Sequence, residues 1–185
     1  LAHLIDGVPS ARLFDEFLKL FQSGHALASY QALRRFGLFE HLFPATAAWL
    51  GPGTDARGRF IEAALASTDA RVAEDRPITP MFLIGVFLWG PVADRAAALA
   101  EQGMSDFQAL AVAAADLTRE QAERIAVPRR FSIPMREMLQ LQSRFDKTRG
   151  ARALAFIESK RFRAAYDLLV LRAAAGNADP GLAHW

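Results

Sequence analysis

At 185 residues the chain can form one domain or two small ones, and a hydrophobic fraction of 52% excludes an intrinsically disordered protein. It has no cysteine, which excludes disulfides, thiolate catalysis and cysteine-based zinc sites. The formal net charge of +2 is unevenly distributed: residues 119–172 carry 13 Lys/Arg against 6 Asp/Glu, whereas residues 1–118 carry 9 against 13. A one-sided basic segment attracts polyanions, so nucleic acid is the first partner to consider. The alternative is that the arginines simply form a solvated helix surface.

Apolar residues recur at helical spacing through the first part of the chain. Ser10 is the expected N-cap of the first helix, and Gly24 and Gly37 are the stop signals after the first and second. Gly51-Pro52-Gly53 predicts a loop after the third. The predicted helices cover residues 10–23, 25–36 and 38–50, with a break near Pro44, and a further amphipathic stripe covers 60–65.

The most apolar run, Met81 to Trp89, is predicted to be a buried helix, because a bilayer span needs ~20 residues. Thr79 is its expected N-cap, Pro80 its first residue, and Gly90-Pro91 its end. No signal peptide is recognisable. A cytoplasmic protein with no membrane partner is therefore expected.

The second half of the chain carries further helix signals. Ser105 is expected to cap a helix that reaches Ala115, Thr118 and Gln121 fit a capping box, and Ser132 is expected to open another helix. The last helix is predicted from about residue 160 to 175. The pattern as a whole predicts an all-α multi-helix bundle of about nine to eleven helices, divided into a helical body (1–118) and a basic C-terminal region (119–185).

The sequence lacks the motifs of the common catalytic centres. It contains no Asp-x-Asp pair for metal-dependent phosphoryl or nucleotidyl transfer, no Walker loop, no Gly-x-Gly-x-x-Gly and no His-x-x-x-His. We therefore predict no catalytic residue, no metal ligand and no cofactor in this chain.

The basic segment offers candidate phosphate contacts, because arginine binds phosphate through two parallel hydrogen bonds. Aromatic residues between the cations can stack on unpaired bases. Phe162, Tyr166, Leu169 and Val170, however, recur at the spacing of a core stripe, and Asp167 is positioned to pair with Arg163. The predicted RNA contacts are Arg129, Arg130, Arg144, Arg149, Arg152, Lys160, Arg161 and Arg163.

Four segments resemble bacterial poly(A) polymerases. The first covers residues 9–44 and includes PSARLFDE at 9–16 and LKLFQSGHALASYQALRRFGLFEHLFP at 18–44. The others are FLIGVFLW at 82–89, IAVPRRFSIPMREMLQLQSRF at 125–145 and RFRAAYDLLVLRA at 161–173, of which the last is the most specific.

The resemblance implies a class II nucleotidyltransferase, a group that includes the tRNA CCA-adding enzymes. Such an enzyme has a head carrying the Asp-x-Asp metal ligands, a neck that recognises ATP, and helical regions that hold the single-stranded RNA 3′ end. The chain would correspond to the helical body and arginine-rich region, and the head and most of the neck are expected to precede Leu1. Mg²⁺ and ATP are expected for the full-length enzyme, which would add AMP to RNA, whereas this chain alone is expected not to polymerise.

Three alternatives remain at this point. The chain could be the equivalent region of a tRNA CCA-adding enzyme. It could be a protein-interaction module that docks an acidic partner, such as an RNA-decay or ribonucleoprotein factor. It could also be a stand-alone helical domain whose basic surface is only solubilising.

Overall fold

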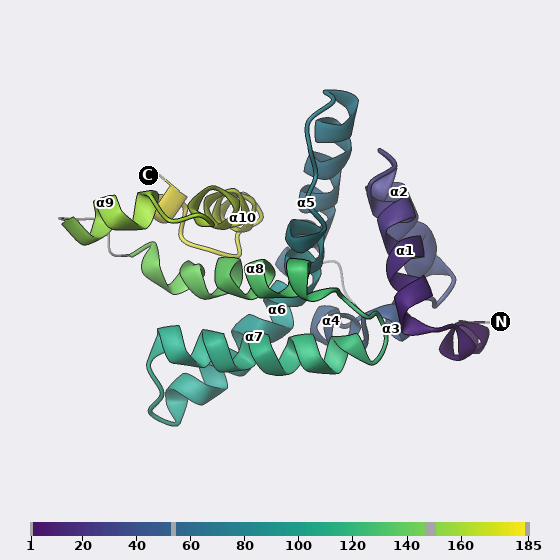
Figure 1. Ribbon diagram of the computed structural model, residues 1–185, viewed down its shortest axis with the longest axis horizontal. Coiled ribbons are helices and arrows are strands. Elements are labelled where there is room, and N and C mark those ends of the chain that lie inside the picture. Colours follow the sequence, from purple (N-terminus) through teal and green to yellow (C-terminus); the bar gives the residue numbers. More distant parts are fainter. Residues whose placement is uncertain (1, 53–54, 147–150, 184–185) are drawn as a thin grey trace.

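The computed structural model describes residues 2–52, 55–146 and 151–183, and within these ranges all regular elements are helices (Figure 1). The predicted all-α class is confirmed, and the ten α-helices in the described ranges fall within the expected number. The α-helices are α1 (Ser10–Phe21), α2 (Ala26–Arg35), α3 (Phe39–Leu42), α4 (Pro44–Leu50), α5 (Ala56–Ala73), α6 (Pro80–Glu101), α7 (Asp106–Ala122), α8 (Arg129–Gln140), α9 (Ala151–Ile157) and α10 (Phe162–Ala174). The 3₁₀ helices are η1 (Ala2–Gly7), η2 (Leu141–Arg144) and η3 (Pro180–Ala183).

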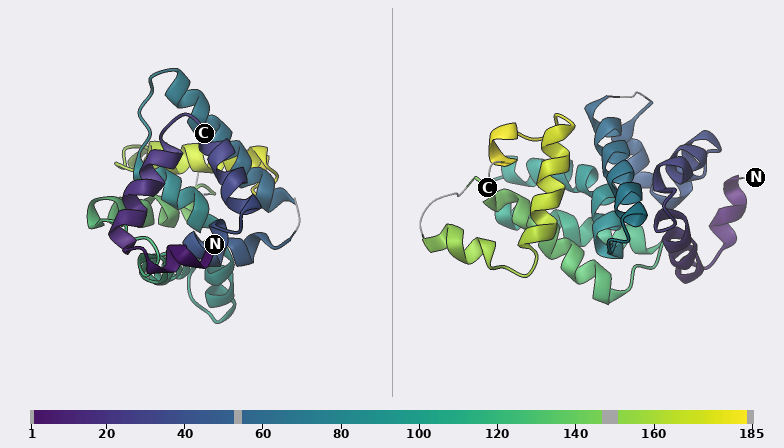
Figure 2. Two further views of the ribbon diagram at one scale, coloured as in Figure 1. Left: turned by 90° about the vertical axis from the view of Figure 1, so that its right-hand side faces the viewer. Right: turned by 90° about the horizontal axis from the view of Figure 1, so that it is seen from above.

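The helices are arranged along an elongated molecule. The N-terminal helices α1–α3 lie towards one end, α4 and α5 lie nearer the middle, and α9, α10 and η3 lie towards the other end (Figures 1 and 2). Helix α6 runs through the centre and packs against α4, α5, α7, α8 and α10. Its position explains why it is the most apolar helix, since it contacts other helices on most sides.

A cluster of aromatic rings forms the part of the core near the N-terminal end. The ring centroids of Phe43 and Phe87 lie 4.7 Å apart, and those of Phe21 and Phe87 lie 5.2 Å apart in an edge-on arrangement. Phe17 and Phe39 complete the cluster, and all five rings are buried. Because burial of one such side chain stabilises a fold by ~1.5–3 kcal/mol, the cluster holds α1, α3 and α6 together.

Helix α6 continues through Gly90-Pro91, so the predicted end at this dipeptide is wrong. Proline has no N–H, and Pro91 therefore leaves the carbonyl oxygen of Phe87 without its usual helical donor. The hydroxyl of Thr46 on α4 donates to that oxygen at 2.8 Å. A side chain from a distant part of the sequence thus satisfies the group that the proline leaves free.

By length and composition alone, α6 could cross a membrane. Buried core helices meet the same criteria, and 61% of its most apolar window is buried inside the protein. The expected buried helix is therefore present, although it is longer than the sequence indicated.

Several helix starts differ from the predicted ones. Ser10 is the first residue of α1, not its cap, and its carbonyl oxygen accepts a hydrogen bond from the backbone N–H of Ala126 at 3.1 Å. The capping box at Thr118 does not form, because α7 runs through it and the hydroxyl of Thr118 donates to the carbonyl of Ala114. Ser132 lies inside α8. The predicted cap at Ser105 is confirmed: its hydroxyl accepts from the N–H of Gln108 at 3.4 Å.

The N-terminus of α2 is capped from another helix. The carboxylate of Asp69 on α5 accepts hydrogen bonds from the backbone N–H groups of Ala26, at 2.6 Å, and Leu27, at 3.1 Å. A carboxylate at a helix N-terminus satisfies free N–H groups and complements the helix dipole. The second helix of the chain is therefore completed by the fifth.

The core is continuous across the expected division of the chain. The boundary after residue 118 falls inside α7, and one cluster of buried residues extends from Phe14 to Ala175. Among the described residues, the helical body and the basic region share this core.

Candidate nucleic-acid interface

Two of the predicted contacts, Arg129 and Arg130, open helix α8 and are exposed. The side chain of Arg129 forms no hydrogen bond or ion pair with any residue that the structure describes. The guanidinium carbon of Arg130 lies 4.9 Å from the ring centroid of Phe131, which packs against the core. Both cations are therefore available to a ligand, and one of them is supported by an aromatic ring.

The remaining described candidates lie around η2 and the start of α10. Lys160 is exposed and has no ion pair within the described ranges. Arg144 is half-buried, with its guanidinium carbon 5.0 Å from the ring centroid of Phe156.

Two arginines at the start of α10 already have acidic partners. Nε of Arg161 lies 3.0 Å from Oε2 of Glu137 on α8, and Nε of Arg163 lies 3.0 Å from Oδ1 of Asp167. The second pair confirms the pairing expected from the sequence. Arg163 remains 84% exposed, so its guanidinium can still reach a ligand.

Two candidates cannot be placed. Arg149 lies outside the described residues, and the structure describes the backbone of Arg152 in α9 but not its side chain. Their proposed contacts stay predictions.

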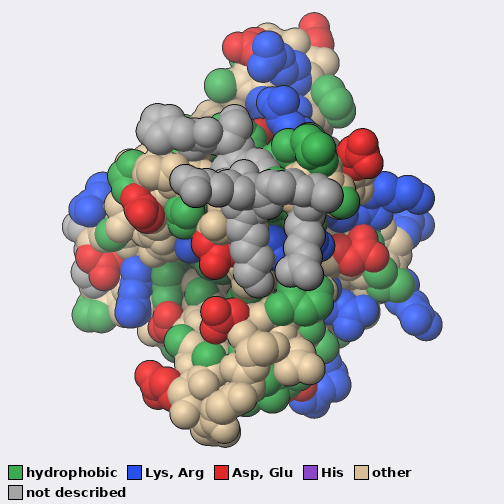
Figure 3. All heavy atoms as spheres, turned by 90° about the vertical axis from the view of Figure 1, so that its left-hand side faces the viewer, with side chains coloured by type: hydrophobic (Ala, Val, Ile, Leu, Met, Phe, Trp, Pro, Cys, Tyr) green, Lys and Arg blue, Asp and Glu red, His purple; other side chains and the backbone are tan. Residues whose placement is uncertain are grey.

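The described candidates form two groups. Arg129 and Arg130 begin the 12-residue helix α8, and Arg144 follows its other end. A helix of this length is ~18 Å long, so the two groups are separated along it. Figure 3, which shows the end of the molecule with α9 and the C-terminal residues, has acidic side chains interspersed among the basic ones. No single continuous basic surface is visible on this face around the described residues.

Arg172 contributes to the charge of the segment but lies largely inside the protein. Burial lowers its pKa to about 10. Its guanidinium carbon lies 4.0 Å from the ring centroid of Trp89, and Nη1 donates to Oε1 of Gln142 at 2.7 Å. Nη2 donates to the carbonyl oxygen of Asn177 at 3.3 Å. Arg172 thus connects α6, η2 and the end of α10. Its side chain stabilises the packing of these helices and is not an exposed cation.

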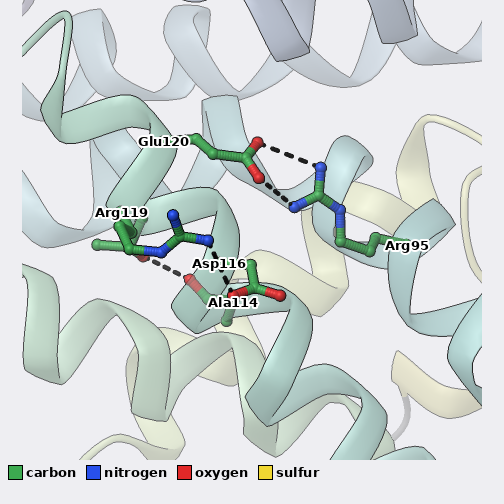
Figure 4. A network of polar contacts seen from close by, with 6 residues as sticks. Arg95, Ala114, Asp116, Arg119 and Glu120 are labelled. Carbon is green, nitrogen blue, oxygen red and sulfur yellow. Dashed lines mark hydrogen bonds and ion pairs between the residues drawn. The ribbon is translucent and has the colours of Figure 1, made fainter.

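Acidic partners also reduce the basic character around α7 (Figure 4). Arg95 forms a two-pronged pair with Glu120, at 2.7 and 3.2 Å, and its pKa is raised mainly by this hydrogen bond. Arg119 lies 3.4 Å from Asp116. The Arg119 pair thus neutralises one cation of residues 119–172, whereas the Arg95 pair neutralises one of the acids of that segment.

The start of α8 adjoins the start of α1. The backbone hydrogen bond between Ala126 and Ser10 joins the two segments, and the rings of Phe14 and Phe131 lie 5.9 Å apart. Arg12, in the first turn of α1, is exposed and has no ion pair among the described residues. It was not among the predicted contacts, because a single arginine in a near-neutral stretch gives no charge signal.

No group of three or more His, Asp or Glu side chains that could hold a metal ion occurs among the described residues.

Two family models match the chain. Residues 102–185 match "Polymerase A arginine-rich C-terminus", and residues 1–50 match "Probable RNA and SrmB- binding site of polymerase A". The hydrogen bond between Ser10 and Ala126 therefore joins the two matched segments.

Curated relatives cover nearly the whole chain. It is 38% identical over 179 residues to poly(A) polymerase I of Salmonella typhi, which is 96% of this chain and 38% of that relative. It is 38% identical over 175 residues to poly(A) polymerase I of Escherichia coli O6:H1 (94% of this chain, 38% of the relative). It is 39% identical over 175 residues to poly(A) polymerase I of Haemophilus influenzae (94% and 39%). The chain thus spans less than half the length of these relatives.

Proposed function

Because the chain belongs to the poly(A) polymerase family, we propose that it is the helical portion that holds RNA in an enzyme adding AMP from ATP to RNA 3′ ends. The strand it holds is single-stranded. The polymerising activity is proposed for the whole protein, since the chain covers only 38% of the Salmonella relative.

The observation that carries this proposal is the contact between α1 and the turn before α8. It brings the segment matched as an RNA-binding site next to the arginine-rich segment. Arg129 and Arg130 are exposed there, without ion pairs to the described residues. Two adjacent cations without ion pairs form a place where phosphates can displace water without breaking an existing ion pair.

The chemistry of this junction suits a backbone contact. Each guanidinium can donate two parallel hydrogen bonds to a phosphate, which binds the strand without reading its sequence. The planar guanidinium of Arg130 can also stack on an unpaired base, while Phe131 holds it from beneath. The junction would thus hold many RNA sequences in the same way.

The other components belong to the enzyme as a whole. Mg²⁺ and ATP supply the nucleotidyl-transfer chemistry, and in our proposal the described residues act only by binding and positioning RNA. A cytoplasmic location, and a protein partner of the RNA-decay or ribonucleoprotein type on residues 1–50, belong to the same proposal. The description that pairs RNA with SrmB for this segment supports the protein partner.

The proposal predicts that the double variant Arg129→Gln/Arg130→Gln binds single-stranded RNA more weakly. Each lost phosphate contact on a single strand should reduce the slope of log affinity against log salt by ~0.7, so the pair should reduce it by ~1.4. Fluorescence anisotropy of labelled oligo(A) over a salt series measures both quantities.

The matched control is Arg76→Gln/Arg119→Gln. These arginines are exposed and already paired, with Glu74 at 3.1 Å and Asp116 at 3.4 Å. The control removes the same formal charge and should keep most of the slope. Equal slopes for the two double variants would contradict the assigned contacts. Wild-type RNA binding by the Arg129/Arg130 variant would instead favour docking of an acidic protein at this surface.

A further inference from the structure

A groove of about 400 Å³ lies between α5, the loop before α6, and α10. Helices α5 and α10 pack beside each other, as Figure 2 also shows. A volume of this size falls in the range of ~300–1,000 Å³ that small-molecule sites occupy. On the α5 side it is lined by residues 67–82, which neither family model covers.

The floor of the groove is apolar. Val170, expected from the sequence to belong to a core stripe, is instead 38% exposed and lies in this groove. Its neighbours in the stripe, Phe162 and Tyr166, are partly buried against the core, and Leu169 is buried. The apolar residues that line the groove are Pro77, Ile78, Met81, Phe82, Ala164, Val170 and Leu171.

Basic side chains stand on both walls. Arg71 belongs to the α5 wall, where its Nη2 donates to the carbonyl oxygen of Pro77 at 3.1 Å. Lys160 and Arg163 belong to the α10 wall. The acidic side chain in the lining is Asp167, which is paired with Arg163. Lys160 has no such partner among the described residues, so the lining has an excess of positive charge.

We propose that this groove receives one nucleotide of the bound RNA, with the base against the apolar floor and the adjoining phosphates at the basic walls. The inference rests on the proposed function, and it adds a site away from the junction of α1 and α8. The combination of surfaces selects the ligand: a simple anion would leave the apolar floor unused, and an apolar peptide would leave the cations unpaired. A nucleotide offers a flat, poorly hydrated base and a charged phosphate in one unit.

The position of the cations fits a strand that passes through the groove. Arg71 lines the groove on the α5 side, and Lys160 and Arg163 line it on the α10 side. A strand that crosses the groove would therefore have a cation on each side of the base. Lys160 and Arg163 were predicted as RNA contacts from charge alone. The charge pattern predicted only phosphate contacts, whereas the groove adds an apolar surface for the base.

The test fills the groove without changing its charge. Val170→Trp places an indole over the floor, and Val112→Trp is the matched control, because Val112 is also a helical valine, 40% exposed against 38% for Val170. Ser67→Trp fills the groove from the α5 wall. Each variant is compared with wild type for binding to labelled oligo(A), and to an abasic oligomer of the same length, over a salt series.

We expect Val170→Trp and Ser67→Trp each to weaken oligo(A) binding by about five- to tenfold, the effect of losing roughly one stacked base. Affinity for the abasic oligomer and the salt slope should change little, because the phosphate contacts remain. Val112→Trp should match wild type in all three measurements. Circular dichroism melting confirms that each variant folds.

The possible results distinguish a failure of the groove proposal from a failure of the proposed RNA-holding function on which it rests. Wild-type oligo(A) binding by both groove-filling variants overturns the groove alone. Equal losses for oligo(A) and the abasic oligomer also overturn it, because no base would be involved. No RNA binding by the wild-type protein even at low salt overturns both proposals. Binding of a poly-glutamate peptide is measured with the same variants. If Val170→Trp weakens peptide binding and leaves RNA binding unchanged, the groove binds an acidic peptide instead.

Discussion

The hydroxyl of Thr46 allows a proline to sit in the middle of the central helix. Thr46 is fully buried, and its hydroxyl donates a hydrogen bond to the carbonyl oxygen of Phe87. Pro91 cannot donate to this oxygen because it has no N–H. An unpaired buried carbonyl costs ~1–3 kcal/mol. The single side chain thus offsets a large part of the cost of the proline.

We predict that Thr46→Val lowers the free energy of unfolding by ~1–3 kcal/mol, because valine keeps the shape but leaves the carbonyl of Phe87 without a donor. Urea unfolding followed by circular dichroism measures the change.

Thr118→Val is the control for this prediction. The hydroxyl of Thr118 donates to the carbonyl of Ala114 within α7, but that carbonyl also accepts the regular i→i−4 bond of the helix, so it keeps a partner. We expect a loss below ~0.5 kcal/mol. Equal losses for the two variants would contradict the role assigned to Thr46.

Residue identities alone did not reveal which arginines are on the surface. Arg172 and Arg163 look equivalent in the sequence of α10, yet the first stacks on Trp89 and the second is 84% exposed. The Arg172 partners Gln142 and Trp89 lie 30 and 83 residues away in the chain, so local spacing contains no information about its burial. The sequence identified the basic segment correctly but not its division into structural and exposed cations.

At the scale of elements, α6 approaches its neighbours closely at two glycines. A Cβ added to Gly90 would overlap the ring of Trp49, which is itself 8% exposed. A Cβ added to Gly85 would meet the terminal methyl of Met138. The first obstacle is a rigid, fused ring in the core, whereas the second is the flexible end of a side chain.

We predict that Gly90→Ala lowers the free energy of unfolding by ~1–3 kcal/mol, through overpacking against Trp49. Gly85→Ala should lower it less or raise it slightly, because Met138 can move and alanine favours the helix by ~1 kcal/mol. Thermal and urea unfolding of the two variants give the comparison. A larger loss for Gly85→Ala would contradict the packing described for α6.

The helices were predictable, but several of their ends were not. The spacing of apolar residues is local, and it gave α1, α2 and α10 to within a few residues, as well as the break at Pro44. The continuation of α6 through Pro91 and the start of α2 involve side chains of other helices, Thr46 and Asp69. These hydrogen-bond partners come together only in the folded chain, so the local sequence pattern could not identify them.

At the scale of the whole molecule, the buried core extends from Phe14 to Ala175 and passes through α6 and α7. Helix α7 crosses the position where charge changes sign, so charge does not mark a boundary of packing. The distribution of charge along the chain and the distribution of buried contacts are therefore independent features of this protein.

We predict a single cooperative unfolding transition. Because α6 packs on helices from both ends of the molecule, neither end can lose its contacts without exposing the core of the other. In differential scanning calorimetry the calorimetric and van't Hoff enthalpies should agree. Two resolved transitions, or a calorimetric enthalpy well above the van't Hoff value, would show that the ends unfold separately.

The candidate interface was only partly predictable for the same reason. Charge indicated a candidate segment, but the junction of α1 with the start of α8, and the groove beside α10, are formed by segments far apart in the sequence. The sequence shows which residues these segments contain, but only the fold shows that the segments lie next to each other.

The cap that Asp69 provides for α2 also has a consequence for how the chain is made. Asp69 follows Ala26 by 43 residues. A ribosome adds ~5–20 residues per second, so the acceptor for the first N–H groups of α2 is synthesised about 2–9 s after those groups. During that interval the nascent second helix has no carboxylate at its N-terminus, and its completion waits for α5 to leave the ribosome.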